Sequence, residues 1–155
     1  MKSVDSLRSL SYRPFKRLFI GATISNTGTW IETVVIGIYM QAKTEDARIV
    51  ATTLAAGYLP QALIGLLSGP IADRFPRKKL IILCNCIAAC IAALLAASVQ
   101  FELATPALVI SLVFIAGFVS AVSFPAWQAL IHDVVPRDKV AGALTLMFAQ
   151  WNLGR

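Results

Sequence analysis

The sequence predicts an all-α membrane protein, a polytopic bundle of helices with its N-terminus in the cytoplasm. Three observations support this fold class. Hydrophobic residues make up 57% of the chain and charged residues only 14%, whereas an ordinary soluble domain carries roughly 25% charged residues. The apolar residues form long runs, with the charges clustered in short segments between them. Basic residues are frequent in every second segment and rare in the others, and this asymmetry is the one that orients membrane proteins.

Four apolar runs are complete, at residues 18–40, 49–71, 80–99 and 107–126, and a fifth occupies 140–155. Each complete run has about 20 residues or more, enough for a helix to span a hydrocarbon core of roughly 30 Å. Barrel strands would be shorter and would alternate in polarity. The first run is also too long for a signal peptide, and no small-residue cleavage site follows it. We therefore expect membrane helices at these positions, the fifth of them truncated.

The segments between the runs predict the orientation. Eleven basic residues fall on the side of the N-terminus: Lys2, Arg8, Arg13, Lys16, Arg17, Arg74, Arg77, Lys78, Lys79, Arg137 and Lys139. The opposite side carries two, Lys43 and Arg48. Because basic loops stay in the cytoplasm, the pattern predicts a multi-pass protein of a bacterial-type inner membrane. It also explains the net charge of +6 without nucleic acid, since no folded basic face is predicted.

The first run has two different faces when it is drawn as a helix. One half is polar and contains Thr23, Ser25, Asn26, Thr29, Glu32 and Thr33. The other half is apolar and contains Ile20, Ile24, Ile31, Val35 and Ile38. A polar half in a membrane helix must face protein or water. It therefore lines a cavity, or it holds helices together through hydrogen bonds and a close approach at Gly28.

Three residues on this helix are candidates for a substrate or proton pathway: Asn26, Trp30 and Glu32. Glu32 is the one ionisable residue inside the four complete runs, and it lies roughly 22 Å into the membrane at helical rise. It either binds a proton or a cation, or lies at the outer mouth paired with Lys43 or Arg48. Trp30 either stacks on a substrate or packs in the interior.

Glycine and proline mark the second and fourth runs. Gly65 and Gly69 form a GxxxG pair that permits close helix contact, and Pro60 is expected to kink the helix. Pro125 is expected to bend or stop the fourth helix, with Trp127 in the interfacial belt and His132 in a cytoplasmic loop.

An enzyme is not predicted, because the sequence contains no Ser/His/Asp set, metal cluster or phosphate-binding loop. Cys84, Cys86 and Cys90 lie within one apolar run, where small apolar packing explains them better than a soft-metal site. We accordingly expect no cofactor and no metal.

The segment from Gly69 to Leu80 carries the clearest motif. It resembles the signature of the major facilitator superfamily, G-x-L-A-D-R-x-G-R-[RK]-x-x-L, with matches at Gly69, Ala72, Asp73, Arg74, Arg77 and Lys78. Pro76 replaces the usual glycine. The motif lies in the predicted cytoplasmic loop between the second and third helices, as in that family. Segments such as Phe124-Pro125-Ala126-Trp127 further resemble the enterobactin-exporter-like, predicted drug-efflux branch.

The resemblance implies a fold of twelve helices in two halves, with substrate bound between the halves. It implies that this chain is an incomplete N-terminal half of such a protein, whose second half is its missing partner. It also assigns conformational gating to Gly69, Asp73, Arg74, Arg77 and Lys78. One departure concerns proton coupling, since many proton-driven exporters have an arginine where this chain has Val113, four residues before Gly117.

Three functions are compatible with these observations. The first is a secondary-active exporter of small amphipathic molecules such as drugs or siderophores, working by alternating access, with proton antiport as one means of coupling. The second is an importer with the same fold. The third is a small membrane interaction protein, or a fragment, that does not transport. The expected partners are the lipid bilayer, a small-molecule substrate and the second half of the transporter.

Overall fold

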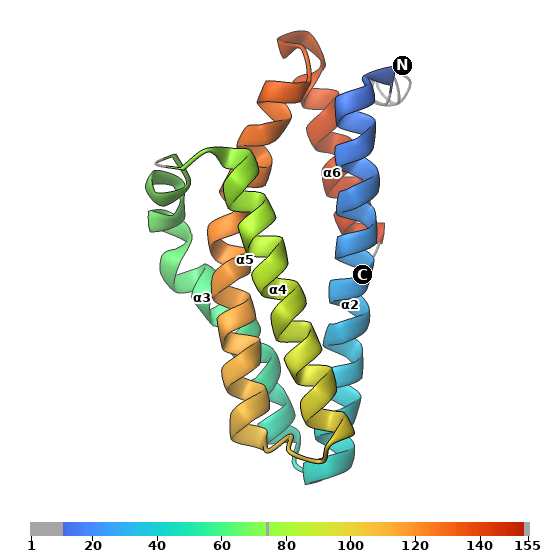
Figure 1. Cartoon of the computed structure of the whole chain (residues 1–155), viewed down its shortest axis with the longest axis vertical. Coiled ribbons are helices and arrows are strands. Elements are labelled where there is room, and N and C mark those ends of the chain that lie inside the picture. Colours follow the sequence, from blue (N-terminus) through green and yellow to red (C-terminus); the bar gives the residue numbers. More distant parts are fainter. Residues whose placement is uncertain (1–10, 74, 154–155) are drawn as a thin grey trace. The chain divides into compact units, whose positions relative to one another are not determined.

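A computed structural model describes residues 11–73 and 75–153, with side chains described outside 65–74. The elements in order are α2 (Arg13–Thr44), α3 (Ala47–Asp73), α4 (Arg77–Gln100), α5 (Pro106–Val134), the 3₁₀ turn η2 (Arg137–Lys139) and α6 (Val140–Leu153). Figure 1 shows these helices joined by short connections. Over the described ranges the regular structure is all helical, which confirms the predicted fold class.

The helices extend beyond the apolar runs that predict them. α2 begins at Arg13 and ends at Thr44, whereas the run covers 18–40. Charged and polar residues at the ends of a membrane helix lie at the depth of the lipid headgroups, so the helix continues where the hydrophobic pattern stops. Within the described residues, α4 and α5 are long and apolar enough to cross a membrane. α2 has the length, but its threonines, Asn26 and Glu32 lower its hydropathy.

Pro125 lies inside α5, which continues to Val134 and has His132 in its last turn. The expectation that the fourth helix can stop at this proline, with His132 in a loop, is therefore wrong. Membrane helices tolerate proline because neighbouring groups can satisfy the carbonyl that it leaves free. The continuation also has apolar side chains to bury, since Ile131 and Val135 are 2% and 4% exposed.

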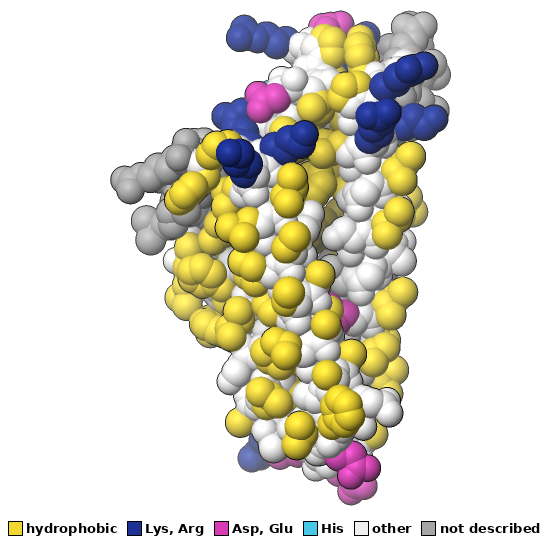
Figure 2. All heavy atoms as spheres, in the orientation of Figure 1, with side chains coloured by type: hydrophobic (Ala, Val, Ile, Leu, Met, Phe, Trp, Pro, Cys, Tyr) yellow, Lys and Arg dark blue, Asp and Glu magenta, His cyan; other side chains and the backbone are white. Residues whose placement is uncertain are grey.

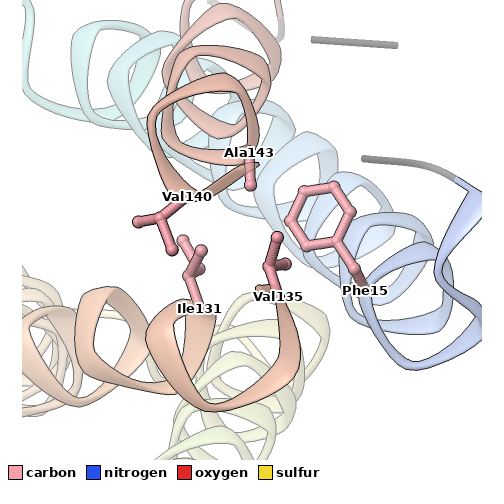
Figure 3. Packing of buried hydrophobic residues seen from close by; sticks show 5 residues of the cluster. All are labelled: Phe15, Ile131, Val135, Val140 and Ala143. Carbon is pink, nitrogen blue, oxygen red and sulfur yellow. The ribbon is translucent and has the colours of Figure 1, made fainter. Parts of the chain in front are cut away.

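The chain divides into two compact units, and α2 and α5 each contribute to both. The first unit consists of Met1–Glu32 and Gln128–Arg155. Its hydrophobic core contains Phe15 from α2, Ile131 and Val135 from the end of α5 and its connection, and Val140 and Ala143 from α6 (Figure 3). Phe15 is fully buried although its neighbours Lys16 and Arg17 are exposed. The phenylalanine thus anchors the start of α2 while the basic side chains remain accessible.

The second unit consists of Thr33–Trp127. Its hydrophobic core contains Met40, Ile91, Leu95, Ala104 and Val109, drawn from α2, α4, the α4–α5 turn and α5. Two non-glycine residues adopt the left-handed conformation at the turns of this unit, Glu45 with φ 53° and Glu102 with φ 57°. Both terminate helices and let the chain reverse within a few residues.

Many large apolar side chains are exposed along the middle of the helices (Figure 2). Ile24 is 70% exposed, Ile38 66% and Leu63 64%. A soluble protein would hide such surfaces, whereas lipid covers them in a membrane. The outside of each unit is therefore suited to a bilayer.

Candidate functional site

The two halves of α2 differ in burial as well as in polarity. The five residues of the apolar half, Ile20, Ile24, Ile31, Val35 and Ile38, are 49–70% exposed. In the polar half Asn26 is buried, and Thr23, Glu32 and Thr33 are half-buried. Trp30 is half-buried as well. α2 therefore presents isoleucine to lipid and directs much of its polar half toward protein.

Three threonine hydroxyl groups of α2, two from the polar half and that of Thr27, bond to the backbone of the same helix. Thr23 Oγ1 donates to Phe19 O at 2.8 Å, Thr27 Oγ1 to Thr23 O at 2.9 Å, and Thr29 Oγ1 to Ser25 O at 3.1 Å. Threonine makes such bonds to the carbonyl one turn earlier without a partner helix. Because these hydroxyl groups already have hydrogen-bond partners, placing them in a membrane costs little free energy. They do not by themselves require a water-filled cavity.

Asn26 makes its contact with another helix. Its Nδ2 donates to Trp151 O of α6 at 3.5 Å, and the side chain is 7% exposed. Gln150 of α6, also 7% exposed, donates through Nε2 to Ala22 O at 3.5 Å. Asn26, which is predicted for a substrate pathway, is thus placed in a helix–helix contact. Gln150 is not among the residues predicted from the sequence, because the candidates for the pathway were all drawn from the first run.

Gly28 does not provide a close approach between helices. A Cβ atom added there would meet nothing within 4 Å among the described residues, and the same holds for Gly21 and Gly37. The part of the helix-contact interpretation that relied on Gly28 is therefore wrong. In the first unit, amide groups join α2 to α6 instead.

Lys43 and Arg48, the two basic residues predicted for the outer side, have contacts close by in sequence. Lys43 Nζ lies 3.1 Å from Tyr39 OH and 5.5 Å from the centre of the Tyr39 ring. The ammonium group thus contacts the tyrosine one turn earlier on its own helix. Arg48 has its backbone N–H bonded to Asp46 Oδ1 at 2.8 Å, where Asp46 caps the start of α3.

The gating motif spans the end of α3 and the start of α4. Gly69 and Asp73 belong to α3, whose last residue is Asp73, but the side chain of Asp73 lies outside the described part. Arg74 lies outside the described residues altogether. Arg77, which is half-buried, and Lys78, which is exposed, open α4. The motif is thus split between two helix ends, and residues that the sequence places in a loop between the apolar runs 49–71 and 80–99 belong to α3 and α4.

α3 and α5 meet at a pair of glycines in the second unit. A Cβ added at Gly117 would clash with Gly57 O and would lie 2.9 Å from Gly57 C. A Cβ added at Gly57 would lie 3.2 Å from Val113 Cγ1. The residue that replaces the arginine of many proton-driven exporters therefore packs against α3. The GxxxG pair Gly65 and Gly69, to which the sequence points, lies outside the residues whose side-chain surroundings are described. Gly57 and Gly117, which are remote in sequence, form a second glycine contact that the sequence does not predict.

The cysteines show no paired arrangement. Cys84 is buried, Cys86 and Cys90 are exposed, and all three are free thiols. Across residues 11–73 and 75–153, no group of three His, Cys, Asp or Glu side chains is placed to hold a metal ion.

Comparison with known proteins gives consistent results. Residues 4–155 match the family described as transmembrane secretion effector, a branch of the major facilitator superfamily. The chain is 30% identical over 88% of its length to an uncharacterised MFS-type transporter, YkuC, of Bacillus subtilis (strain 168). It is 28% identical over 81% of its length to macrolide efflux protein A of Streptococcus pyogenes. No solved structure matches it significantly.

The chain spans about a third of the length of these relatives, 32% of the first and 31% of the second. The matches place it among membrane transporters rather than enzymes. Both the all-helical structure and the loop motif between α3 and α4 are expected of such a protein. Since the family match covers nearly the whole sequence, the chain belongs to the major facilitator superfamily, within its transmembrane secretion effector family.

Proposed function

We propose that the protein containing this chain is a secondary-active exporter of small amphipathic molecules that works by alternating access. The observation that carries the proposal is the two-sided α2, with exposed isoleucines on one half and Asn26, Trp30 and Glu32 buried or half-buried. A helix of this kind lies between lipid and a polar interior. Similarity to macrolide efflux protein A supports export and favours a macrolide as the first substrate to test.

Trp30 and Glu32 supply suitable chemistry for such a substrate. An indole ring offers a flat apolar surface that also attracts cations. A carboxylate within the membrane can bind a proton or the amino group of a drug. With Val113 at the position of the missing arginine, Glu32 is the residue of the described membrane helices to which we assign proton coupling.

Gating is assigned to the motif residues Gly69, Asp73, Arg74, Arg77 and Lys78. Asp73 is the last residue of α3, and α4 has basic residues and no acidic residue in its first turn. Helix dipoles disfavour an acid at a C-terminus and a base at an N-terminus. These charges therefore gain little from their own helices. This supports a role in contacts that form and break with another part of the transporter, beyond membrane orientation alone.

The test is uptake and retention of radiolabelled erythromycin in a susceptible bacterium that expresses the whole open reading frame encoding this chain. We expect accumulation to fall below that of cells with an empty vector, and to recover when the proton gradient is collapsed. Equal accumulation in both strains, at verified membrane expression, would overturn macrolide export. A siderophore would then be tested in the same cells, as the enterobactin-exporter-like branch suggests. Failure with both would favour the membrane interaction protein.

A further inference from the structure

Two buried amides join α2 and α6 in opposite directions. Asn26 of α2 donates to the backbone of α6 at Trp151 O, and Gln150 of α6 donates to the backbone of α2 at Ala22 O. Both donor–acceptor distances are 3.5 Å, and both side chains are 7% exposed. In Figure 1, α6 lies beside the first half of α2. Each helix thus provides one amide donor and one carbonyl acceptor to the other.

Other polar side chains on the same helices behave differently. Thr23, Thr27 and Thr29 of α2 bond to their own helix. Asn152, two residues after Gln150, donates through Nδ2 to Phe148 O of α6 at 2.8 Å and is exposed. A polar group that faces lipid must find a partner within its own helix, whereas a buried amide can bond across to another. The contrast marks Asn26 and Gln150 as the residues that define the polar contact between the two helices.

We propose that Asn26 and Gln150 form a reciprocal amide clamp that fixes the rotation of α2 on α6 and so acts as a positioning device for Trp30. Trp30 follows Asn26 by four residues, about one helical turn, and therefore lies on nearly the same face. A change in the rotation of α2 at Asn26 turns Trp30 by the same angle. Both amides are positioning residues and do not touch the substrate. The role of Trp30 in substrate binding rests on the proposed function.

The test uses the protein expressed from its whole open reading frame, with Asn26→Leu, Gln150→Met and the double variant. The matched control is Asn152→Leu, which removes an amide from the same helix but breaks a bond within it. Two quantities are measured for each variant: the Tm of the purified protein in detergent, and the KM and maximal rate of erythromycin efflux in cells with equal expression.

We expect each single variant to lower Tm by about 2 °C and to raise KM about fivefold, as expected when one hydrogen bond of substrate positioning is lost. The maximal rate should change little. The double variant should lower Tm by less than the sum of the single variants, because the two bonds depend on the same helix contact. Asn152→Leu should leave both quantities at wild-type values.

The other outcomes separate the clamp from the proposed function. Unchanged Tm in both single variants would overturn the clamp. A lower Tm with unchanged KM would support the helix contact but overturn its role in positioning. If wild-type cells do not export erythromycin, that result counts against macrolide export and the positioning role that depends on it, while the Tm series still decides whether the amides clamp α2 to α6.

Discussion

At the scale of single residues, some polar groups of α2 form hydrogen bonds within the helix, whereas others need a partner outside it. The threonine hydroxyls return to their own backbone. Glu32 cannot form the same kind of bond, because an ionised carboxylate only accepts hydrogen bonds and so cannot donate to a backbone carbonyl. It is half-buried, in a segment that the sequence predicts to span the membrane. A carboxylate kept in this setting is expected to serve transport.

Glu32→Gln removes the titratable group and retains its shape. If Glu32 couples efflux to protons, erythromycin efflux by the wild-type protein should decrease as external pH rises and the inward proton gradient shrinks. The Glu32→Gln variant should lose this dependence. The measurement is the initial efflux rate across a series of external pH values, with Thr27→Val, an exposed change on the same helix, as the control. A pH dependence equal to that of the wild type would leave Glu32 with a structural role.

Asp73→Asn tests gating at the end of α3. The substitution removes the charge and keeps the size of the side chain, so contacts that require the carboxylate are lost. Efflux should fall by about tenfold, the effect of roughly 1.4 kcal/mol, while the amount of protein in the membrane stays unchanged. Lys79→Gln, which changes a residue explained by membrane orientation alone, is the control. Undiminished efflux by the Asp73→Asn variant would exclude the gating role.

At the scale of elements, α3 and α5 approach each other closely enough for their backbones to be in contact. α3 and α5 approach at Gly57 and Gly117, where Gly117 is buried and has no room for a methyl group. Small residues permit such approaches, and dispersion forces between backbones then hold membrane helices together. Val113 packs against Gly57 at the same crossing, since a Cβ added at Gly57 would lie 3.2 Å from Val113 Cγ1.

Gly117→Ala should destabilise the protein by about 1–3 kcal/mol, because the added methyl group would force the two backbones apart. Gly37→Ala is the matched control, since a Cβ at that position meets nothing within 4 Å, and alanine favours the helix by about 1 kcal/mol. Thermal unfolding of the purified proteins in detergent distinguishes them. A Gly117→Ala variant that unfolds at the wild-type temperature would contradict the close contact.

At the scale of the whole molecule, the basic segments predict which ends of the helices face the cytoplasm. Translational fusions to alkaline phosphatase test this orientation, because the enzyme is active only outside the cytoplasm. Fusions after Glu45 and Glu102 should be active, and fusions after Pro76 and Arg137 inactive. Substitution of Arg77, Lys78 and Lys79 by alanine should reduce the difference in phosphatase activity between the fusion after Pro76 and the fusions after Glu45 and Glu102. Active fusions after Pro76 would reverse the predicted topology.

Much of the fold could be predicted because membrane helices obey local constraints. Length and hydropathy locate a helix, and charge orients it, without reference to any other helix. The loop motif likewise depends on residues that are adjacent in sequence, and it identified the superfamily. The ends of the helices were less predictable, since polar residues at the headgroups continue a helix that hydropathy ends. The course of α5 through Pro125 was missed for a different reason, since proline usually interrupts a helix but membrane helices tolerate it.

The contacts between helices could not be predicted in the same way. Gly57 and Gly117 meet only because α3 and α5 cross there, whereas a Cβ at Gly21, Gly28 or Gly37 would meet nothing within 4 Å in the described part of the chain. The pairing of Asn26 with α6 and of Gln150 with α2 likewise joins residues that are more than a hundred positions apart. The sequence by itself determined that the chain is built of long apolar helices and where they lie, because length and hydropathy belong to each segment separately. The tertiary structure alone decided which polar and small residues of those segments meet, because that choice depends on how the helices pack.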